Sequence, residues 1–457
     1  MTDTVYDMVV LGAGSGGYAA ALRGAQLGLR VALIEADKVG GTCLHRGCVP
    51  TKALLHAAET ADAVRGARAL GVDAELRGVD MAALNAYKDS IVTRMHKGLQ
   101  GLVASRGIDL IAGRGRLAAS DAVEVDGRTV RGRNIVLATG SYSKTLGQRI
   151  DDRVLTSEGA LRLERVPASA VVLGGGVIGV EFASAWASLG ARVTIVEALP
   201  RLVPGEDEAV SKQLERAFRK RRIAVRTNTM FESVERHDDG VTVHTQDGKT
   251  HDAEVMLIAV GRGPVTADLG YEQAGVAMDR GFVTTDGLGR TSVPGVWAVG
   301  DIVPGVQLAH RGFAQGIVVA EKIAGLDPAP VDDALVPKVT FCEPEIASVG
   351  LTEARARQVH GADAVTTAEF NVAGNAKSQI LGAQGFVKLV SLKDGPIVGF
   401  HAIGARMGEQ VGEGQLIVNW EADADDVAAL VHAHPTQNET LGEAAMALAG
   451  KPLHNHG

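Results

Sequence analysis

The chain has 457 residues, of which 46% are apolar, 22% charged and 4% aromatic, and its formal net charge is −8. This length exceeds what one hydrophobic core usually organises, so we expect several domains. The acidic balance and the few aromatic residues argue against a nucleic-acid-binding protein. No run approaches the roughly 18 apolar residues of a membrane span, and no basic and apolar leader is visible, so we expect a cytoplasmic protein.

The first organised segment is a buried strand followed by a glycine-rich turn. Residues 7–11 predict a strand, residues 12–17 a turn into a helix, and residues 30–35 a second strand. In such a unit the glycines allow a tight turn, close approach of a pyrophosphate and close helix–strand packing, while a terminal acid binds ribose. The predicted dinucleotide-binding residues are Gly12, Gly14, Gly17 and Glu35.

Two cysteines five positions apart follow, in the sequence Gly40-Gly-Thr-Cys43-Leu-His-Arg-Gly-Cys48-Val-Pro-Thr-Lys52. Pro50 favours the first turn of a helix that runs to about Val64. Cys48 then lies at a helix N-terminus, where the dipole favours the thiolate. Because residues five apart in a regular helix are too distant for a disulfide, we expect Cys43 on a loop folded back toward Cys48. The pair is predicted to be redox-active.

Two other interpretations of the cysteines remain open. A structural disulfide is disfavoured by the reducing compartment and by the short loop that it would close. Half of a zinc site is disfavoured because no second Cys/His pair has matching spacing, so no metal site is expected. The third cysteine, Cys342, is expected to be a small buried apolar residue.

The glycine unit then repeats. Residues 170–173 predict a strand, residues 174–179 the turn and residues 192–197 the second strand; Gly12 to Glu35 and Gly174 to Glu197 both span 23 positions. Two dinucleotides are therefore predicted, with electrons passing between them. The second set consists of Gly174, Gly176, Gly179 and Glu197.

Later segments add strands and a linker. Residues 255–260, 295–301 and 385–391 predict strands, residues 422–431 a helix, and residues 327–337 a proline-rich linker. The basic run 219–222 closes a helix that begins near Glu208, and we interpret it as a solvated helix end rather than a nucleic-acid patch.

With these motifs in place, the chain resembles the class I flavoprotein disulfide reductases along nearly its whole length, and the segment from Gly40 to Lys52 is the most specific match. The resemblance implies an α/β fold with two Rossmann-like domains and an α+β C-terminal domain. The implied boundaries are an FAD domain at 1–143, an inserted NAD domain at 144–262, a return to the FAD or central domain at 263–336, and a dimerisation domain at 337–457.

The resemblance also implies roles for residues beyond the glycines. Lys52 and Glu181 resemble the ion pair beside the flavin, and Asp301 the residue that binds the ribityl chain. Further FAD-binding residues implied are Thr42, Thr139, Gly140 and Ala309, and Gly261 is implied for NAD together with Glu181. His434 resembles the catalytic base, oriented by Glu439 and contributed by the partner subunit, which implies a homodimer. His454 and His456 are expected to be a polar tail.

Within the family, the dihydrolipoamide dehydrogenase branch is the best match. Glu197 favours NAD over NADP, and residues 308–316 resemble that branch's helix near the flavin. The implied partners are the lipoyl-bearing proteins of 2-oxoacid dehydrogenase or glycine-cleavage systems. The alternative is a reductase of a small disulfide of the mycothione or glutathione type. One departure stands out, because His45 replaces the usual Asn between the cysteines, where it could lower a thiol pKa, alter the substrate entrance or be a tolerated surface change.

Overall fold

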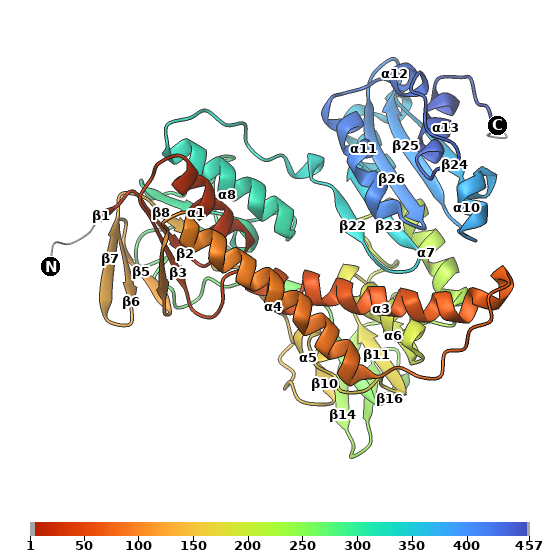
Figure 1. The fold of residues 1–457 in the computed structure, drawn as a ribbon, viewed down its shortest axis with the longest axis horizontal. Helices are drawn as coiled ribbons and strands as arrows, with labels where there is room; N and C mark the ends of the chain where they lie inside the picture. Colours follow the sequence, from red (N-terminus) through yellow and green to blue (C-terminus); the bar gives the residue numbers. More distant parts are fainter. Residues whose placement is uncertain (1–4, 455–457) are drawn as a thin grey trace. The chain divides into compact units, whose positions relative to one another are not determined.

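The computed structural model describes residues 5–454 and divides the chain into two compact units (Figure 1). The first unit comprises Met1–Leu54, Ala82–Lys144 and Gly261–Asp333, and the second comprises Leu55–Met81, Thr145–Val260 and Ala334–Gly457. The N-terminal residues 1–4 and the tail residue His456 lie outside the described part. The four predicted domain boundaries remain predictions, because the units group segments rather than delimit each domain.

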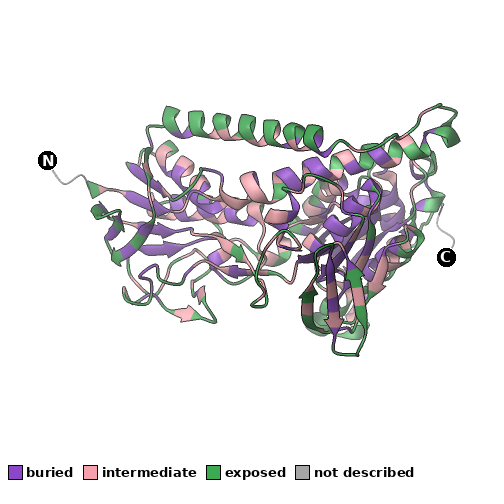
Figure 2. Cartoon of the chain, turned by 90° about the horizontal axis from the view of Figure 1, so that it is seen from below, coloured by how far each residue is buried: buried purple, intermediate pink, exposed green. Residues whose placement is uncertain are grey.

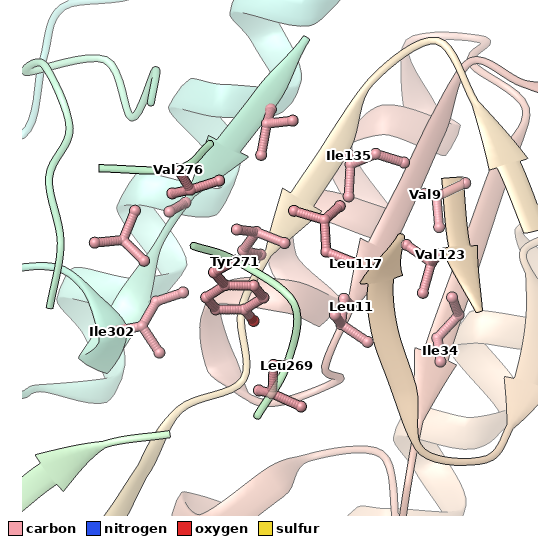
Figure 3. Packing of buried hydrophobic residues seen from close by; sticks show 14 of the residues in the cluster. Val9, Leu11, Ile34, Leu117, Val123, Ile135, Leu269, Tyr271, Val276 and Ile302 are labelled. Carbon is pink, nitrogen blue, oxygen red and sulfur yellow. The ribbon is translucent and has the colours of Figure 1, made fainter. Parts of the chain in front are cut away.

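The first unit is built on a five-stranded parallel sheet in the order β21-β8-β2-β3-β4. Its strands are β2 (Met8–Leu11), β3 (Val31–Glu35), β4 (Asp109–Ala112), β8 (Ile135–Leu137) and β21 (Val296–Ala298). The central strands are continuous apolar runs, as expected for a parallel sheet buried on both faces. One face packs on the cluster drawn in Figure 3, where Tyr271 and Leu117 meet Leu11 and Ile135.

Two helices with small residues cross closely on this sheet. α1 (Ser15–Gln26) lies beside α8 (Ala309–Ile323), as Figure 1 shows. A Cβ on Gly316 of α8 would lie 2.3 Å from the Gly16 carbonyl oxygen of α1, so the two backbones approach too closely for any side chain here. The first unit also contains a sheet in the order β1 (Val5–Tyr6), β7 (Arg128–Gly132), β6 (Ala122–Val125) and β5 (Gly115–Ala119). A separate pair is formed by β9 (Ser141–Ser143) and β18 (Arg262–Pro264).

The second unit repeats the parallel sheet, in the order β10-β17-β11-β12-β13. Its strands are β10 (Val154–Leu155), β11 (Ser169–Leu173), β12 (Arg192–Val196), β13 (Ala224–Arg226) and β17 (Val255–Ile258). α6 (Val177–Leu189) joins β11 to β12 as α1 joins β2 to β3, and α7 (Glu208–Lys220) follows. A three-stranded antiparallel sheet precedes β17 and consists of β14 (Phe231–Arg236), β15 (Val241–Thr245) and β16 (Thr250–Ala253). Two Rossmann-like segments are thus confirmed.

The C-terminal part of the second unit is an antiparallel sheet. Its strand order is β22 (Lys338–Thr340), β23 (Glu345–Gly350), β26 (Ile397–Gly404), β25 (Phe386–Leu392) and β24 (Val365–Asn371). Alternate residues of β25 (Phe386–Leu392), such as Val387 and Leu389, pack on α11 (Met407–Asn419), α12 (Ala424–Ala428) and α13 (Glu439–Leu448). Figure 2 shows buried residues concentrated in the strands and exposed residues on helices and loops. This part is the predicted α+β region, although the helix expected over residues 422–431 is limited to α12.

Candidate active site

The first glycine loop has the crowding that a dinucleotide turn requires. Gly12 has a φ of +101°, and a Cβ there would lie 2.4 Å from the Ala138 carbonyl oxygen. A Cβ on Gly17 would lie 1.8 Å from the Gly12 carbonyl oxygen, so α1 packs directly on the turn. Around Gly14, in contrast, no atom lies within 4 Å of a Cβ position. The first and third glycines are thus required by the protein itself, and the second borders open space.

The second glycine loop has the same geometry. Gly174 has a φ of +105°, and a Cβ there would lie 2.5 Å from the Ala259 carbonyl oxygen. A Cβ on Gly179 would lie 1.9 Å from the Gly174 carbonyl oxygen, and Gly176 again has open space around its Cβ position.

Each loop is held by the acid at the end of the following strand. Glu35 Oε2 accepts a hydrogen bond from the Ala13 N–H at 2.7 Å, and its Oε1 accepts from the Asp37 N–H at 2.8 Å. Glu197 accepts in the same way from the Gly175 and Leu199 N–H groups, at 2.5 and 2.7 Å. Because a carboxylate has about four acceptor positions, both acids keep capacity for ribose hydroxyls.

Both loops fit the pyrophosphate of a dinucleotide. The N-cap residues of α1 and α6 are Gly14 and Gly176, which have no side chain to bind the free N–H groups of the first turn. Uncapped N–H groups and the positive end of a helix dipole favour a phosphate. The residues that would hold FAD and NAD at these turns are therefore present in both copies.

The two cysteines lie on consecutive helical segments of the first unit. Cys43 is in α2 (Gly41–Arg46), and Cys48 is the first residue of α3 (Cys48–Gly66). The expectation that Cys43 lies on a loop is wrong. The helical path breaks instead at Gly47, with φ −137° and ψ −111°, and this break brings the two thiols together although neither lies in an irregular loop.

The two thiols are hydrogen-bonded to each other, and this bond changes the pKa of Cys43. The hydrogen bond with Cys48, followed by burial, raises the pKa of Cys43, and the nearby Lys52 opposes this shift. The proton therefore stays on the half-buried Cys43, while Cys48 is exposed and benefits from the N-terminus of α3. All three cysteines are reduced, without a disulfide bond, in this structure, and Cys342 is buried with 1% exposure, as predicted.

Tyr18 is a neighbour of the cysteines that sequence reasoning missed. Burial and then the charge of Cys43 raise the pKa of Tyr18 to about 12. Its ring packs on Phe313 of α8 with 5.4 Å between ring centroids. Tyr18 follows the glycine turn directly, but nothing in its sequence context distinguishes it from a core aromatic residue.

His45 is bound within its own segment. Its Nε2 lies 2.9 Å from the Val39 carbonyl oxygen, and its ring meets that of His96 edge-on with 4.8 Å between centroids. His96 lies on α4 (Met81–Ser105), and burial together with the charge of His45 lowers its pKa. These contacts anchor the His45 ring to Val39 and α4.

Three of the predicted flavin-side residues, Thr139, Gly140 and Asp301, form hydrogen bonds near the points where the chain leaves and re-enters the first unit. Thr139 Oγ1 donates to the Val265 carbonyl oxygen at 2.6 Å, and the Val265 N–H donates to the Gly140 carbonyl oxygen. Asp301 Oδ2 accepts from Ser141 Oγ at 2.5 Å. Ala309 begins α8, Thr42 lies in α2 beside Cys43, and Gly261 has a φ of +106°.

The predicted Lys52–Glu181 ion pair remains a prediction, because the two residues belong to different units. Lys52 lies on α3, one turn after Cys48. Glu181 lies on α6 with 3% exposure, and its Oε1 accepts from the Phe341 N–H at 2.9 Å.

The predicted base and its orienting acid are in contact in the second unit. His434 Nδ1 lies 2.8 Å from Glu439 Oε1, and 72% of the His434 side chain is exposed. Partial burial raises the pKa of Glu439, but hydrogen bonds from the Thr436 N–H and from His434 outweigh it and hold that pKa below its usual value. The carboxylate is thus ionised and fixes the tautomer of His434, leaving Nε2 to accept a proton.

His454 lies in an exposed polar tail, as predicted, but its ring also has a partner that the sequence did not reveal. Its Nδ1 lies 2.6 Å from Glu443 Oε1, and its backbone N–H donates to Glu443 Oε2 at 3.0 Å. Glu443 is 6% exposed, and a buried carboxylate requires partners, which the tail supplies. His456 lies outside the described residues.

Within residues 5–454, none of the helices has the length and apolar content that crossing a membrane would require. In the same range, no group of three or more His, Cys, Asp and Glu side chains is arranged to hold a metal ion.

Twin dinucleotide turns with a reactive cysteine pair define the class of nucleotide-linked disulfide oxidoreductases. The family model for pyridine nucleotide-disulphide oxidoreductases matches residues 6–316, and the model for the dimerisation domain of that family matches residues 336–445. The chain belongs to this family of enzymes. Its cofactors are FAD and NAD, and the matched dimerisation domain supports a homodimer.

Named relatives narrow the comparison. The chain is 39% identical to a dihydrolipoyl dehydrogenase of Bacillus subtilis, covering 98% of this chain and 97% of the relative, and 38% identical to that of Geobacillus stearothermophilus, with the same coverage. Among solved structures, LpdA of Mycobacterium tuberculosis has a TM-score of 0.90 and 28% identity, covering 96% of this chain and 99% of that one. The HOCl-induced flavoprotein disulfide reductase RclA of Escherichia coli has a TM-score of 0.87 and 27% identity, with the same coverage. These relatives do not favour the small-disulfide alternative.

Proposed function

We propose that the protein is a dihydrolipoyl dehydrogenase, which oxidises protein-bound dihydrolipoyl groups and reduces NAD⁺ by cycling Cys43 and Cys48 between disulfide and dithiol. The observation that carries this proposal is the hydrogen-bonded thiol pair at the start of α3. It lies in the same unit as the first glycine loop. When bound, FAD accepts the electron pair of the dithiol and NAD⁺ receives it as a hydride.

The oxidised cysteine pair accepts two electrons from the substrate. One thiol of the dihydrolipoyl group loses its proton to His434, and the resulting thiolate attacks the Cys43 sulfur. The Cys43–Cys48 bond breaks and Cys48 leaves as a thiolate. The second substrate sulfur then displaces Cys43, which closes the lipoyl disulfide and leaves Cys43 and Cys48 reduced.

The asymmetry of the thiol pair suits these two roles. Cys48 has the helix N-terminus and the hydrogen bond with Cys43 to stabilise a thiolate. Cys43 keeps its proton because the bond with Cys48 and burial raise its pKa. Cys43 therefore serves as the sulfur that exchanges with substrate, and Cys48 as the sulfur that delivers electrons to the flavin.

The base acts from the other subunit of the homodimer. Glu439 holds His434 by Nδ1, so Nε2 accepts the thiol proton and later releases it to solvent. Glu197 selects NAD by accepting from ribose hydroxyls and repelling a 2′-phosphate. The lipoyl carriers of 2-oxoacid dehydrogenase or glycine-cleavage systems are the partners, and the cytoplasm is the compartment, consistent with a working dithiol.

The test is anaerobic NADH formation from dihydrolipoamide and NAD⁺ by the purified holoenzyme. Cys48→Ser is expected to lower the rate by more than about 10³-fold, because the nucleophilic pair acts as a unit. Cys342→Ser is the matched control, since Cys342 is buried away from both roles. Retention of NADH formation by Cys48→Ser would contradict the mechanism, and faster turnover of mycothione or glutathione disulfide by the wild type would contradict the substrate.

A further inference from the structure

A second histidine–glutamate pair lies two residues before the base. His432 Nε2 lies 2.7 Å from Glu413 Oε1, and the His432 and Glu413 side chains are 13% and 24% exposed. Glu413 belongs to α11, whereas Glu439 begins α13. Carboxylates from two helices therefore hold two histidines of one short segment.

The His432 ring is bound at Nε2 by Glu413. The Glu413 hydrogen bond raises the pKa of His432, aided by the charge of Glu439 and opposed by partial burial. A carboxylate at hydrogen-bond distance therefore favours the charged form of His432.

Glu413 also holds the other end of the same segment. Its Oε2 accepts a hydrogen bond from Asn438 Nδ2 at 2.5 Å. The neighbouring Gln437, 7% exposed, donates to the Ala405 carbonyl oxygen and accepts from Ser378 Oγ. Residues 432–438 connect α12 to α13 without regular structure, so these side chains fix their course.

A glycine of α13 makes room for the His432 ring. A Cβ on Gly442 would lie 2.6 Å from His432 Nδ1. Glycine in a helix interior costs about 1 kcal/mol relative to alanine. The His432 ring therefore explains why glycine, and not a better helix former, stands at position 442.

We propose that His432 and Glu413 are positioning residues, which hold the segment 432–438 so that His434 presents its free nitrogen to the substrate thiol. This inference rests on the proposed function, in which His434 accepts the substrate proton. His434 needs such support because its own side chain is 72% exposed and Glu439 binds it at one nitrogen. Glu413 binds His432 on one side of the base and Asn438 on the other. Its two hydrogen bonds go to these neighbours and not to His434.

The pair also sets the charge near the base. The charged groups that act on His432 are Glu413 from α11 and Glu439 from α13. Glu439 is also the acid that binds His434, and both histidines act on its pKa. Replacing His432 by glutamine leaves the Glu413 carboxylate without a compensating cation. The extra negative charge favours a protonated base, so the acid limb of the kcat/KM profile moves to higher pH.

The variants are His432→Gln and Gly442→Ala, with His454→Gln as the control. His454 forms a similar pair with Glu443, but it holds the tail. In NADH formation from dihydrolipoamide we expect His432→Gln and Gly442→Ala to lower kcat/KM about 10-fold, less than the ~10²–10⁴-fold expected for removing a base. NADH oxidation by ferricyanide needs no substrate proton, and it should stay within about two-fold in all three variants.

The outcomes separate the two proposals. A wild type that forms no NADH from dihydrolipoamide overturns the proposed function. An active wild type with variants equal to His454→Gln, or with an unmoved acid limb in His432→Gln, overturns the positioning role, as does a parallel loss of the ferricyanide rate. If His432→Gln does not fold, Gly442→Ala decides, because alanine favours the helix and its methyl group displaces the ring.

Discussion

The two glycine loops make matching backbone contacts, but the segments that follow them differ. In the first copy the Gly40 N–H donates to the Ala13 carbonyl oxygen at 2.8 Å, and in the second the Val203 N–H donates to the Gly175 carbonyl oxygen at the same distance. Both segments return across their loop after the second strand. The repeat therefore extends beyond the glycines and acids to the backbone that covers the turn.

Beyond that contact the two copies diverge. The first segment enters α2 and reaches Cys43 within three residues of Gly40. The second segment reaches Asp207, which caps α7 and binds Lys388. The two copies share the loop that would hold a nucleotide. The segment that follows carries Cys43 in the first copy and the Asp207–Lys388 ion pair in the second.

The largest expected effect comes from placing a methyl group on the third glycine of each loop. Gly17→Ala and Gly179→Ala both place Cβ within 2 Å of a backbone oxygen, so the turn and helix must separate. Gly17→Ala should lose its flavin and with it at least about 10²-fold in activity, because the ADP turn no longer closes. Gly179→Ala should keep its flavin and show a similar loss in NAD-dependent turnover. Flavin absorbance and NADH formation measure the two effects separately.

The second glycines provide the control for folding. Gly14→Ala and Gly176→Ala meet no protein atom within 4 Å, so both should fold with normal melting temperatures. Loss of flavin from Gly179→Ala, or full flavin in Gly17→Ala, would mean that the assignment of the two loops to FAD and NAD is reversed or wrong.

A smaller effect is expected at the two loop-holding acids. Glu197→Gln replaces an acceptor of the Gly175 and Leu199 N–H groups by an amide, one end of which is itself a donor. Losing one charge-assisted hydrogen bond of about 1.5 kcal/mol corresponds to roughly 10-fold, which should appear as a higher KM for NAD⁺. The preference for NAD⁺ over NADP⁺ should narrow, because the charge that repels a 2′-phosphate is gone.

Glu35→Gln is the reciprocal variant. It should weaken flavin retention and leave the NAD⁺/NADP⁺ ratio unchanged, since Glu35 holds the first loop. Equal changes in nucleotide preference in both variants would show that the acids act through general stability rather than through their own nucleotides.

The sequence predicted what depends on local backbone chemistry. The glycine positions, the terminal acids and the start of α3 all follow from turns and helix ends within a few residues. The location of Cys43 was mispredicted because the break at Gly47 is a backbone conformation that glycine permits and no pattern specifies. The partners of His432 and His454 were missed because Glu413 and Glu443 lie on helices whose packing brings them near, and charge pairs of this kind have no sequence period.

The smallest effect on turnover is expected at the ion pair that follows the second loop. Lys388 Nζ binds Asp207 Oδ1 at 2.9 Å and Glu353 Oε2 at 2.7 Å, and the Lys388 and Asp207 side chains are 9% and 3% exposed. Burial raises the pKa of Asp207, but the Lys388 hydrogen bond outweighs it and the net shift is downward. A depressed folded pKa contributes stability above the unfolded value, and this stability is lost as the pH falls through the folded pKa.

Lys388→Met should therefore lower the free energy of unfolding by about 3 kcal/mol near neutral pH, because it leaves the buried Asp207 carboxylate without its cation, whereas Glu353 keeps its ion pair with Arg357. The difference from wild type should shrink on acidification, since protonation of Asp207 removes the unpaired charge, while turnover per folded enzyme stays within about two-fold. Lys212→Met is the matched control, because Lys212 Nζ lies 2.7 Å from Glu208 Oε1 with the two side chains 65% and 68% exposed, so water can replace the cation at smaller loss. Denaturant unfolding of the holoenzymes, from neutral pH down through the folded pKa of Asp207, measures the free energy of unfolding of both variants. A Lys388→Met variant as stable as wild type would show that the Lys388–Asp207 ion pair does not stabilise the fold. A variant that loses turnover in proportion to its stability would show that the ion pair also matters for turnover.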